Sequence, residues 1–352
     1  MITQTRATPI GLDVRDGYVY AAQLLPAGRG YTARRLAAIP FESDQPGGLS
    51  EESVWTIDAV LERRGFVGSR VVIAAPRDAV RSSVVSVPPG AEGEVVEAIA
   101  RSDLARNHQL SPSEFELACW ELPRISGAAS GAGTALACAC PHEAVMPLVT
   151  RLGSVGRDVV AVDLESRALA RACEPCLSRT DSGLRLIADL GWSSSTVLVM
   201  LGTTILYERT VGEGSLAQLR EEIGATLRIG RNCAERAIMA RGLTPLESGA
   251  SGRSARVFTM IEDYASAIAD EIALSIDYAV RRHGLPDASE VLLTGPGAST
   301  PKLDEHLAQA CDVPTSTLRP SDLVTLDRGA GVLDDPCMLL AIGLARATEK
   351  GA

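Results

Sequence analysis

The chain lacks long apolar runs, basic patches and a secretory leader. No segment of its 352 residues approaches the ~18 consecutive apolar residues of a membrane-spanning helix, so direct membrane insertion is not expected. Residues 1–9 are polar and do not form a signal peptide. No basic patch stands out in a chain of net charge -10, which argues against nucleic acid as a partner. We therefore expect a cytoplasmic protein.

A second Cys/His pair is missing as well. Cys173 and Cys176 have a spacing that is typical of metal ligands, but no other pair completes such a site. The 8 cysteines are expected to be thiols in a reducing compartment. Inert core thiols are therefore the favoured interpretation of this pair, with a zinc or redox role as the alternative.

The composition predicts large cores. Hydrophobic residues make up 46% of the chain and the mean hydropathy is +0.11, which argues against disorder. A chain of 352 residues also exceeds the size at which a single core usually stops growing. We expect two lobes.

The most informative segment runs from Asp189 to Thr196, between the apolar runs 184–188 and 197–201. A strand that ends in Asp-x-Gly and a serine cluster, followed directly by a second strand, is typical of a phosphate-binding loop. The carboxylate can hold a hydrated metal ion, the glycine admits an anion close to the backbone, and the hydroxyls add donors. An ordinary β-turn is the alternative.

The start of the chain repeats this unit. A predicted strand over 10–14 contains Asp13 and is followed by a hairpin into a second strand over 18–25. Two such units in one chain indicate a duplicated α/β body with a cleft between its halves. The alternative for Asp13 is that it caps the hairpin.

Other elements are expected along the chain. Apolar spacing predicts a helix over 255–283 with one buried stripe, and Val291–Thr294 is a strand that leads into the glycine turn Gly295-Pro296-Gly297. Asp158–Val162 is expected to be a short buried strand before a helix over 166–172. The run Val80–Val87 is another predicted strand.

The order and spacing of these motifs resemble the actin-like ATPase superfamily. Within it, the Asp163–Ala172 stretch and the units around Asp13, Asp189 and Gly295 resemble the PilM family of type IV pilus assembly proteins, over about residues 9–347. FtsA and the cytoplasmic domain of GspL are related families. The resemblance implies an α/β, duplicated actin-like (ribonuclease H-like) two-lobe fold with an inserted small subdomain in the first lobe.

The same resemblance implies a division into subdomains. The first lobe core comprises residues 1–78 and 159–183, and the inserted subdomain comprises 79–158. The second lobe core comprises residues 184–213 and 285–352, and a helical subdomain comprises 214–284.

The partners are also expectations from the family. PilM-like proteins lie at the inner face of the inner membrane, in a pilus or type II secretion-like assembly platform. They bind the N-terminal cytoplasmic tail of a PilN-like membrane protein between the main and inserted parts of the first lobe, and self-association into a ring or filament is a further expectation. Strand addition would need an open sheet edge, for which Val80–Val87 is the candidate unless it is buried. The chain ends at Ala352 without a membrane helix or amphipathic tail, which favours PilM over GspL or FtsA.

ATP and Mg²⁺ are the cofactors that the resemblance implies. Asp13 and Asp189 would hold Mg²⁺ through water, and Asp163 or Glu165 would activate the attacking water, although Glu165 also fits a helix N-terminal acid. The positions implied to contact nucleotide are Asp13, Arg15, Asp189, Gly191, Ser193, Ser194, Ser195, Glu235, Gly295 and Gly297.

The chain departs from the family pattern at this site. Arg15 stands at the first phosphate-loop glycine and Tyr20 at the lysine, while Asp16 would bring a carboxylate toward phosphate. Pro296 removes a donor and Ile238 replaces a second lysine. We expect a scaffold with a partly degenerate nucleotide site. The alternatives are an active ATPase, a kinase on the same fold, or a polymerising cytoskeletal ATPase.

Overall fold

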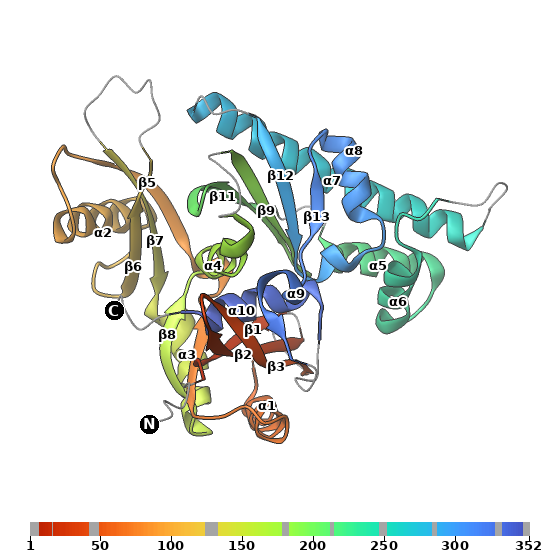
Figure 1. Cartoon of the computed structure of the whole chain (residues 1–352), viewed down its shortest axis with the longest axis horizontal. Helices are drawn as coiled ribbons and strands as arrows, with labels where there is room; N and C mark the ends of the chain where they lie inside the picture. The colour runs from red at the N-terminus through yellow and green to blue at the C-terminus, as the bar shows by residue number, and fades with distance from the viewer. Residues whose placement is uncertain are drawn as a thin grey trace. The chain divides into compact units, whose positions relative to one another are not determined.

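The computed structural model describes residues 7–15, 17–41, 49–123, 133–177, 183–211, 215–245, 252–283, 287–327 and 333–347. The chain divides into two units (Figure 1). Unit 1 comprises Met1–Ala172, Leu326–Val332 and Ala341–Ala352, and unit 2 comprises Cys173–Thr325 and Leu333–Leu340.

Unit 1 is built on a six-stranded sheet with the order β14-β3-β2-β1-β4-β8. The three N-terminal strands form an antiparallel meander, and β4 and β8 add to it in parallel. Gly17, with φ of 88°, lies in the turn between the first two strands, where a side chain would be strained. The strands are β1 (Ile10–Arg15), β2 (Tyr18–Ala27), β3 (Gly30–Pro40), β4 (Arg70–Ala74), β8 (Asp158–Asp163) and β14 (Thr325–Leu326).

Helices pack on this sheet. Ser50 caps α1 (Glu51–Arg63) by accepting a hydrogen bond from the Ser53 amide at 3.1 Å. Side chains of α1 and α3 (His142–Ser154) share a core with the sheet. In α10 (Leu339–Ala345), a Cβ at Gly343 would lie 1.9 Å from the Ala168 carbonyl oxygen of α4 (Glu165–Leu177). This helix pair therefore packs backbone to backbone.

The expectation of a buried strand over Asp158–Val162 is wrong. β8 is the edge strand of the sheet, and Val162 is 43% exposed. An edge strand has a neighbour on one side only, so its side chains lose half of their lateral packing. An apolar sequence alone does not distinguish such an edge from a central strand.

A small β/α layer is inserted between β4 and β8 (Figure 1). After the short helix η1 (Arg77–Ala79), three antiparallel strands pair in the order β5-β7-β6, and one helix covers one face through Val85, Leu104 and Phe115. The elements are β5 (Arg81–Val87), α2 (Glu94–His108), β6 (Phe115–Glu121) and β7 (Gly133–Pro141).

Unit 2 contains a five-stranded sheet with the order β11-β10-β9-β12-β13. Five helices accompany it: α5 (Leu216–Leu227), α6 (Arg231–Arg241), α7 (Arg253–His283), α8 (Leu303–Cys311) and α9 (Pro320–Leu323). Two short 3-10 helices, η2 (Pro296–Ser299) and η3 (Pro336–Met338), complete the unit. The strands are β9 (Leu184–Leu190), β10 (Ser195–Leu201), β11 (Thr204–Val211), β12 (Ala288–Thr294) and β13 (Thr315–Thr317).

The two large sheets repeat one topology. In each, the first strand forms an antiparallel meander with the next two and then takes a later strand in parallel on its other side. A further parallel strand ends the row, β8 in unit 1 and β13 in unit 2. This repeat confirms the duplicated α/β body. No helix in the described part of the chain is both long and apolar enough to cross a membrane.

The stripe predicted for the long helix is confirmed. Residues of α7 at three- and four-residue intervals are buried in the unit 2 core, because they share one face of the helix. These residues are Val257, Ile261, Tyr264, Ile268 and Ile272.

Candidate functional site

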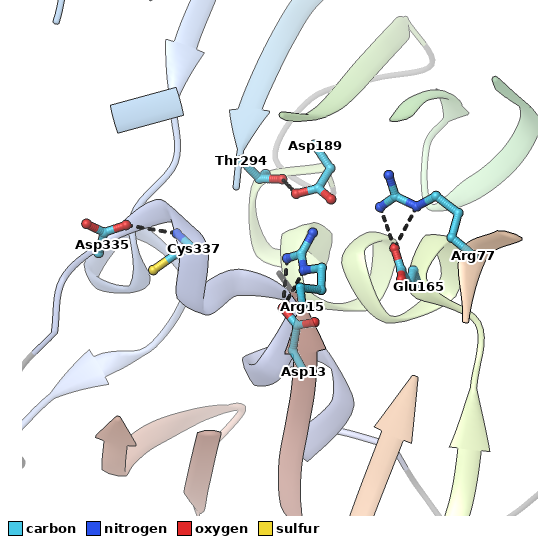
Figure 2. A network of polar contacts seen from close by, with 8 residues as sticks. All are labelled: Asp13, Arg15, Arg77, Glu165, Asp189, Thr294, Asp335 and Cys337. Carbon is cyan, nitrogen blue, oxygen red and sulfur yellow. Dashed lines mark hydrogen bonds and ion pairs between the residues drawn. The ribbon is translucent and has the colours of Figure 1, made fainter. Parts of the chain in front are cut away.

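The phosphate loop that was predicted around Asp13 in unit 1 contains an internal ion pair. Asp13 is 1% exposed, and its Oδ2 accepts hydrogen bonds from Arg15 Nε at 2.8 Å and from Arg15 Nη2 at 2.7 Å (Figure 2). The two residues are two positions apart on β1, so their side chains leave the same face of the strand. The carboxylate that was expected to hold Mg²⁺ through water is thus bound by a guanidinium.

Both residues predicted to activate water are paired in the same way. Glu165 Oε2 accepts a hydrogen bond from Arg77 Nε at 2.8 Å, and Arg77 Nη2 contacts the same oxygen (Figure 2). Asp163 pairs with Arg171, and its Oδ1 accepts from the Leu164 amide at 2.9 Å. All three unit 1 carboxylates assigned to metal binding or catalysis therefore form ion pairs with arginines of the same chain.

Local chain geometry explains these positions. β8 ends at Asp163 and α4 begins at Glu165, so one carboxylate closes the strand and the other lies at a helix N-terminus, where negative charge is favourable. Arg77 comes from η1, at the start of the inserted layer. The Arg77–Glu165 pair thus ties the segment entering the insertion to the helix that follows it.

In unit 2, Asp189 is fully buried near the end of β9. It pairs in register with Thr294 of β12, and Thr294 Oγ1 donates to Asp189 Oδ1 at 2.9 Å (Figure 2). A Cβ at Gly295 would lie 2.6 Å from the same carboxylate oxygen, and Gly295 has φ of 81°. A Cβ at Gly297 would lie 2.7 Å from Leu190 Cβ. The chain's own packing therefore requires both glycines.

The predicted serine cluster divides into two parts. Ser195 is the first residue of β10 and is buried, as is Gly191, whereas Ser193 is exposed and Ser194 is half-buried. β9 and β10 pair as far as Leu190 and Ser195, so residues 191–194 form the loop of a β-hairpin and the alternative of a plain turn stays open. Ser193 and Ser194 are the hydroxyls that solvent reaches, and both have partners within the chain.

A buried tyrosine lies beneath these loops. A Cβ at Gly297 would lie 3.0 Å from the hydroxyl of Tyr264 on α7, and the buried hydroxyl of Ser195 lies close to the same tyrosine. Burial raises the pKa of the Tyr264 phenol far above its usual value, so the hydroxyl stays protonated. Tyr264 thus connects the longest helix to both loops of unit 2.

Several residues that contact this site are not apparent from the sequence. Arg220 of α5 lies 4.8 Å above the ring of Trp192, and the Ala217 amide donates to the Trp192 carbonyl at 2.8 Å. These contacts hold the loop against the start of α5. Arg171 follows its partner Asp163 by 8 residues, whereas Arg77 and Thr294 lie 88 and 105 residues from theirs, so no local motif identifies them.

The remaining predicted positions are not joined to these groups. Glu235 lies half-buried on α6, and among the described residues no hydrogen bond or ion pair links it to Asp189. Ile238 is fully buried in the unit 2 core, which explains its apolar character. Asp16 lies outside the described residues. Within the described ranges, no group of three His, Cys, Asp or Glu side chains could hold a metal ion.

Comparison with solved structures defines the class: the chain has an actin-like ATPase fold. MreB5 of Spiroplasma citri bound to ADP superposes with a TM-score of 0.51 at 14% identity, covering 96% of this chain and 95% of that one. An archaeal actin homologue gives 0.50 at 11% identity, covering 96% and 98%. A chain of the PilM-PilN type IV pilus biogenesis complex gives 0.78 at 20% identity, covering 96% and 97%.

Sequence comparison then gives the family. A search of curated proteins found no match. The model of the family described as type IV pilus assembly protein PilM matches residues 11–348, nearly the whole chain. The chain belongs to the PilM family, as its motif order predicts.

Proposed function

We propose that this protein is a cytoplasmic scaffold at the inner face of the inner membrane, in a type IV pilus or type II secretion-like assembly platform. It binds the N-terminal cytoplasmic tail of a PilN-like membrane protein. One observation carries the proposal: the chain matches a chain of a PilM-PilN complex over 96% of its length with a TM-score of 0.78, against 0.51 for ADP-bound MreB5.

The ion pairs of unit 1 support a role without efficient ATP hydrolysis. A general base must accept a proton from the attacking water, and a carboxylate that is held by hydrogen bonds to a guanidinium has fewer oxygen lone pairs available to that water. Asp163 and Glu165 are both held in this way. Asp13 Oδ2 is bound by two nitrogens of Arg15, and the positive charge of that guanidinium disfavours a cation beside the same carboxylate. No hydrolytic step is therefore assigned to these residues.

ATP binding without turnover remains part of the proposal. Solved neighbours of similar fold contain ADP or AMPPNP. Unit 2 retains the strand, glycine and accessible serines of a phosphate loop, with Ser193 and Ser194 reaching solvent. These features support a partly degenerate site that binds nucleotide as a structural or regulatory ligand.

We place the tail at the junction between the main and inserted parts of unit 1. The guanidinium of Arg167 on α4 lies 5.0 Å from the ring centroid of Trp120 on β6, so side chains of the two parts meet there. Val162, on the open edge strand β8 that precedes α4, is 43% exposed. An open strand edge and an aromatic side chain at the junction both suit an extended peptide.

The test is fluorescence anisotropy of a labelled synthetic peptide that covers the cytoplasmic N-terminal segment of the PilN-like protein from the same organism. Val162→Lys should weaken binding by about tenfold or more, because it places a solvated charge on the contact surface. Val67→Lys is the matched control, since Val67 is 45% exposed and precedes β4 near the first residue of β8, at the opposite end of that strand from Val162. Absence of binding to the unmodified chain, or equal losses in both variants, would contradict the proposed site.

A further inference from the structure

The strand β5 forms an open sheet edge without the usual protection. It lies at one end of the order β5-β7-β6, and its sequence Arg-Ser-Ser-Val-Val-Ser-Val has no proline and a single charge at its first residue. Exposed edges usually carry charges, prolines or bulges that prevent pairing with another chain, or they are very short. β5 has a regular seven-residue pairing with β7 on its other side.

Other edge strands in the described part of the chain are either shorter than β5 or carry two charged side chains where β5 carries one. β13 and β14 contain three and two residues. The longer edges carry acidic or basic side chains within or at the end of the strand: Glu116 and Glu121 in β6, Asp158 and Asp163 in β8, and Glu208 and Arg209 in β11. β5 therefore differs from its counterparts in this molecule.

A groove of about 840 Å³ runs along β5 and α2. Its middle is apolar and includes Val84 and Val95, each 55% exposed, together with Ile99. Its ends are charged, with Glu94 at one end and Asp103 with Arg106 at the other. Val84 alternates with Val85 and Val87, which are buried against α2, so Val84 lies on the face of the sheet opposite the helix, while Val95 lies on the helix itself. Exposed apolar side chains therefore flank the β5 edge on both faces, which suits a partner.

The direction of α2 fixes which charges face which end of β5. Residues 88–93 connect the end of β5 to the start of α2, so Glu94 lies near Val87. At the other end, Ser83 Oγ donates to Asp103 Oδ2 at 2.8 Å. The helix thus runs antiparallel to the strand, with its acidic first turn beside the strand's C-terminus and Arg81 at the opposite end.

We propose that this edge mediates two-fold self-association, in which β5 pairs antiparallel with β5 of a second copy. With the two-fold axis at Val84, each Val84 faces its own copy and Ser82 faces Ser86. Arg81 then lies beside Val87 of the second copy, at the end where that copy carries Glu94. This register pairs opposite charges at both ends and buries the valines in the middle.

The geometry of the inserted layer suits this arrangement. Pairing joins two three-stranded sheets into one six-stranded antiparallel sheet and satisfies the open backbone groups of both edges. Both copies of α2 lie on the same face of that sheet, so their exposed apolar stripes containing Val95 and Ile99 approach each other. The inference gives a surface to the expected self-association and does not depend on tail or nucleotide binding.

The first experiment is analytical ultracentrifugation of the full chain over a micromolar to submillimolar range. The unmodified chain should show a reversible monomer–dimer equilibrium. Val84→Lys should weaken it by at least about tenfold, because two like charges would face each other across the axis. Val162→Lys is the control, since it places the same charge on another open edge strand and should leave the association unchanged.

Charge exchange and crosslinking test the register. Arg81→Glu should weaken the dimer, and Arg81→Glu combined with Glu94→Arg should restore it. In a Cys233→Ser background, which removes the exposed cysteine, Val84→Cys should form a disulfide-linked dimer under mild oxidation while Val162→Cys should not.

Several results would overturn the proposal. These are a monomeric chain at all concentrations, equal association of the Val84 and Val162 variants, or failure of the double charge exchange to restore pairing. If the tail peptide loses affinity for Val84→Lys but binds Val162→Lys normally, β5 is the tail's binding edge and both placements are wrong. Loss of peptide binding in Val162→Lys alone supports the proposed tail site whatever the association state.

Discussion

The ion pair between Arg15 and Asp13 gives the most demanding prediction. Arg15→Ala leaves a carboxylate that is 1% exposed without the guanidinium that binds it at 2.7 and 2.8 Å. Removing one partner of a buried ion pair costs about 3–5 kcal/mol. Because the Arg15 side chain is 12% exposed and water reaches the site, we expect the lower end, about 3 kcal/mol.

A double-mutant cycle isolates this interaction. Asp13→Asn and the combined Asp13→Asn, Arg15→Ala variant complete the cycle, and the coupling energy should be about 1–3 kcal/mol. Urea unfolding is followed by tryptophan fluorescence in a Trp192→Phe background, so that the signal comes from Trp55 and Trp120 in unit 1. A loss of less than about 0.5 kcal/mol in Arg15→Ala, as for an ordinary surface residue, would refute the reasoning.

Three further predictions follow from packing, hydrogen bonding and exposure. Gly343→Ala should lower the free energy of urea unfolding by about 1–3 kcal/mol, because the added Cβ would meet the Ala168 backbone. Gly153→Ala in α3 is the control: a Cβ there has no neighbour within 4 Å, so the change should cost nothing or stabilise by up to about 1 kcal/mol. Thr294→Val should cost about 1–3 kcal/mol because it leaves the buried Asp189 carboxylate without this donor; an unchanged unfolding midpoint would contradict this. Iodoacetamide at pH 7.5 should modify Cys233 first, because Cys233 is exposed whereas burial raises the pKa of the Cys119, Cys140 and Cys311 thiols. Peptide mass spectrometry follows the labelling, and earlier modification of any of the other three would contradict this exposure pattern.

The sequence was sufficient for the framework of the fold. Apolar runs around Asp13 and Asp189, each followed by a hairpin, predict the duplicated sheets because strand period and turn residues are local signals. The stripe of α7 is predictable for the same reason. The exposure of Val162 is not, since its strand becomes an edge through the order in which distant segments pair.

The chemistry of the site was less predictable. The resemblance suggested that Glu165 activates water, yet its partner Arg77 lies 88 residues away and no local pattern joins them. Gly295 was expected to admit a ligand, whereas in the structure the Asp189 carboxylate approaches it closely. Such contacts depend on tertiary packing, which residue spacing does not encode.

Phosphate release from Mg-ATP by the full chain, with and without the tail peptide, tests the account most directly. We predict that the peptide binds, with or without nucleotide, and that no phosphate release exceeds that of a protein-free control. Sustained turnover that is abolished by Glu165→Gln would contradict the account, because it would show that Glu165 acts as a base despite its pairing with Arg77 and that the protein is an active ATPase.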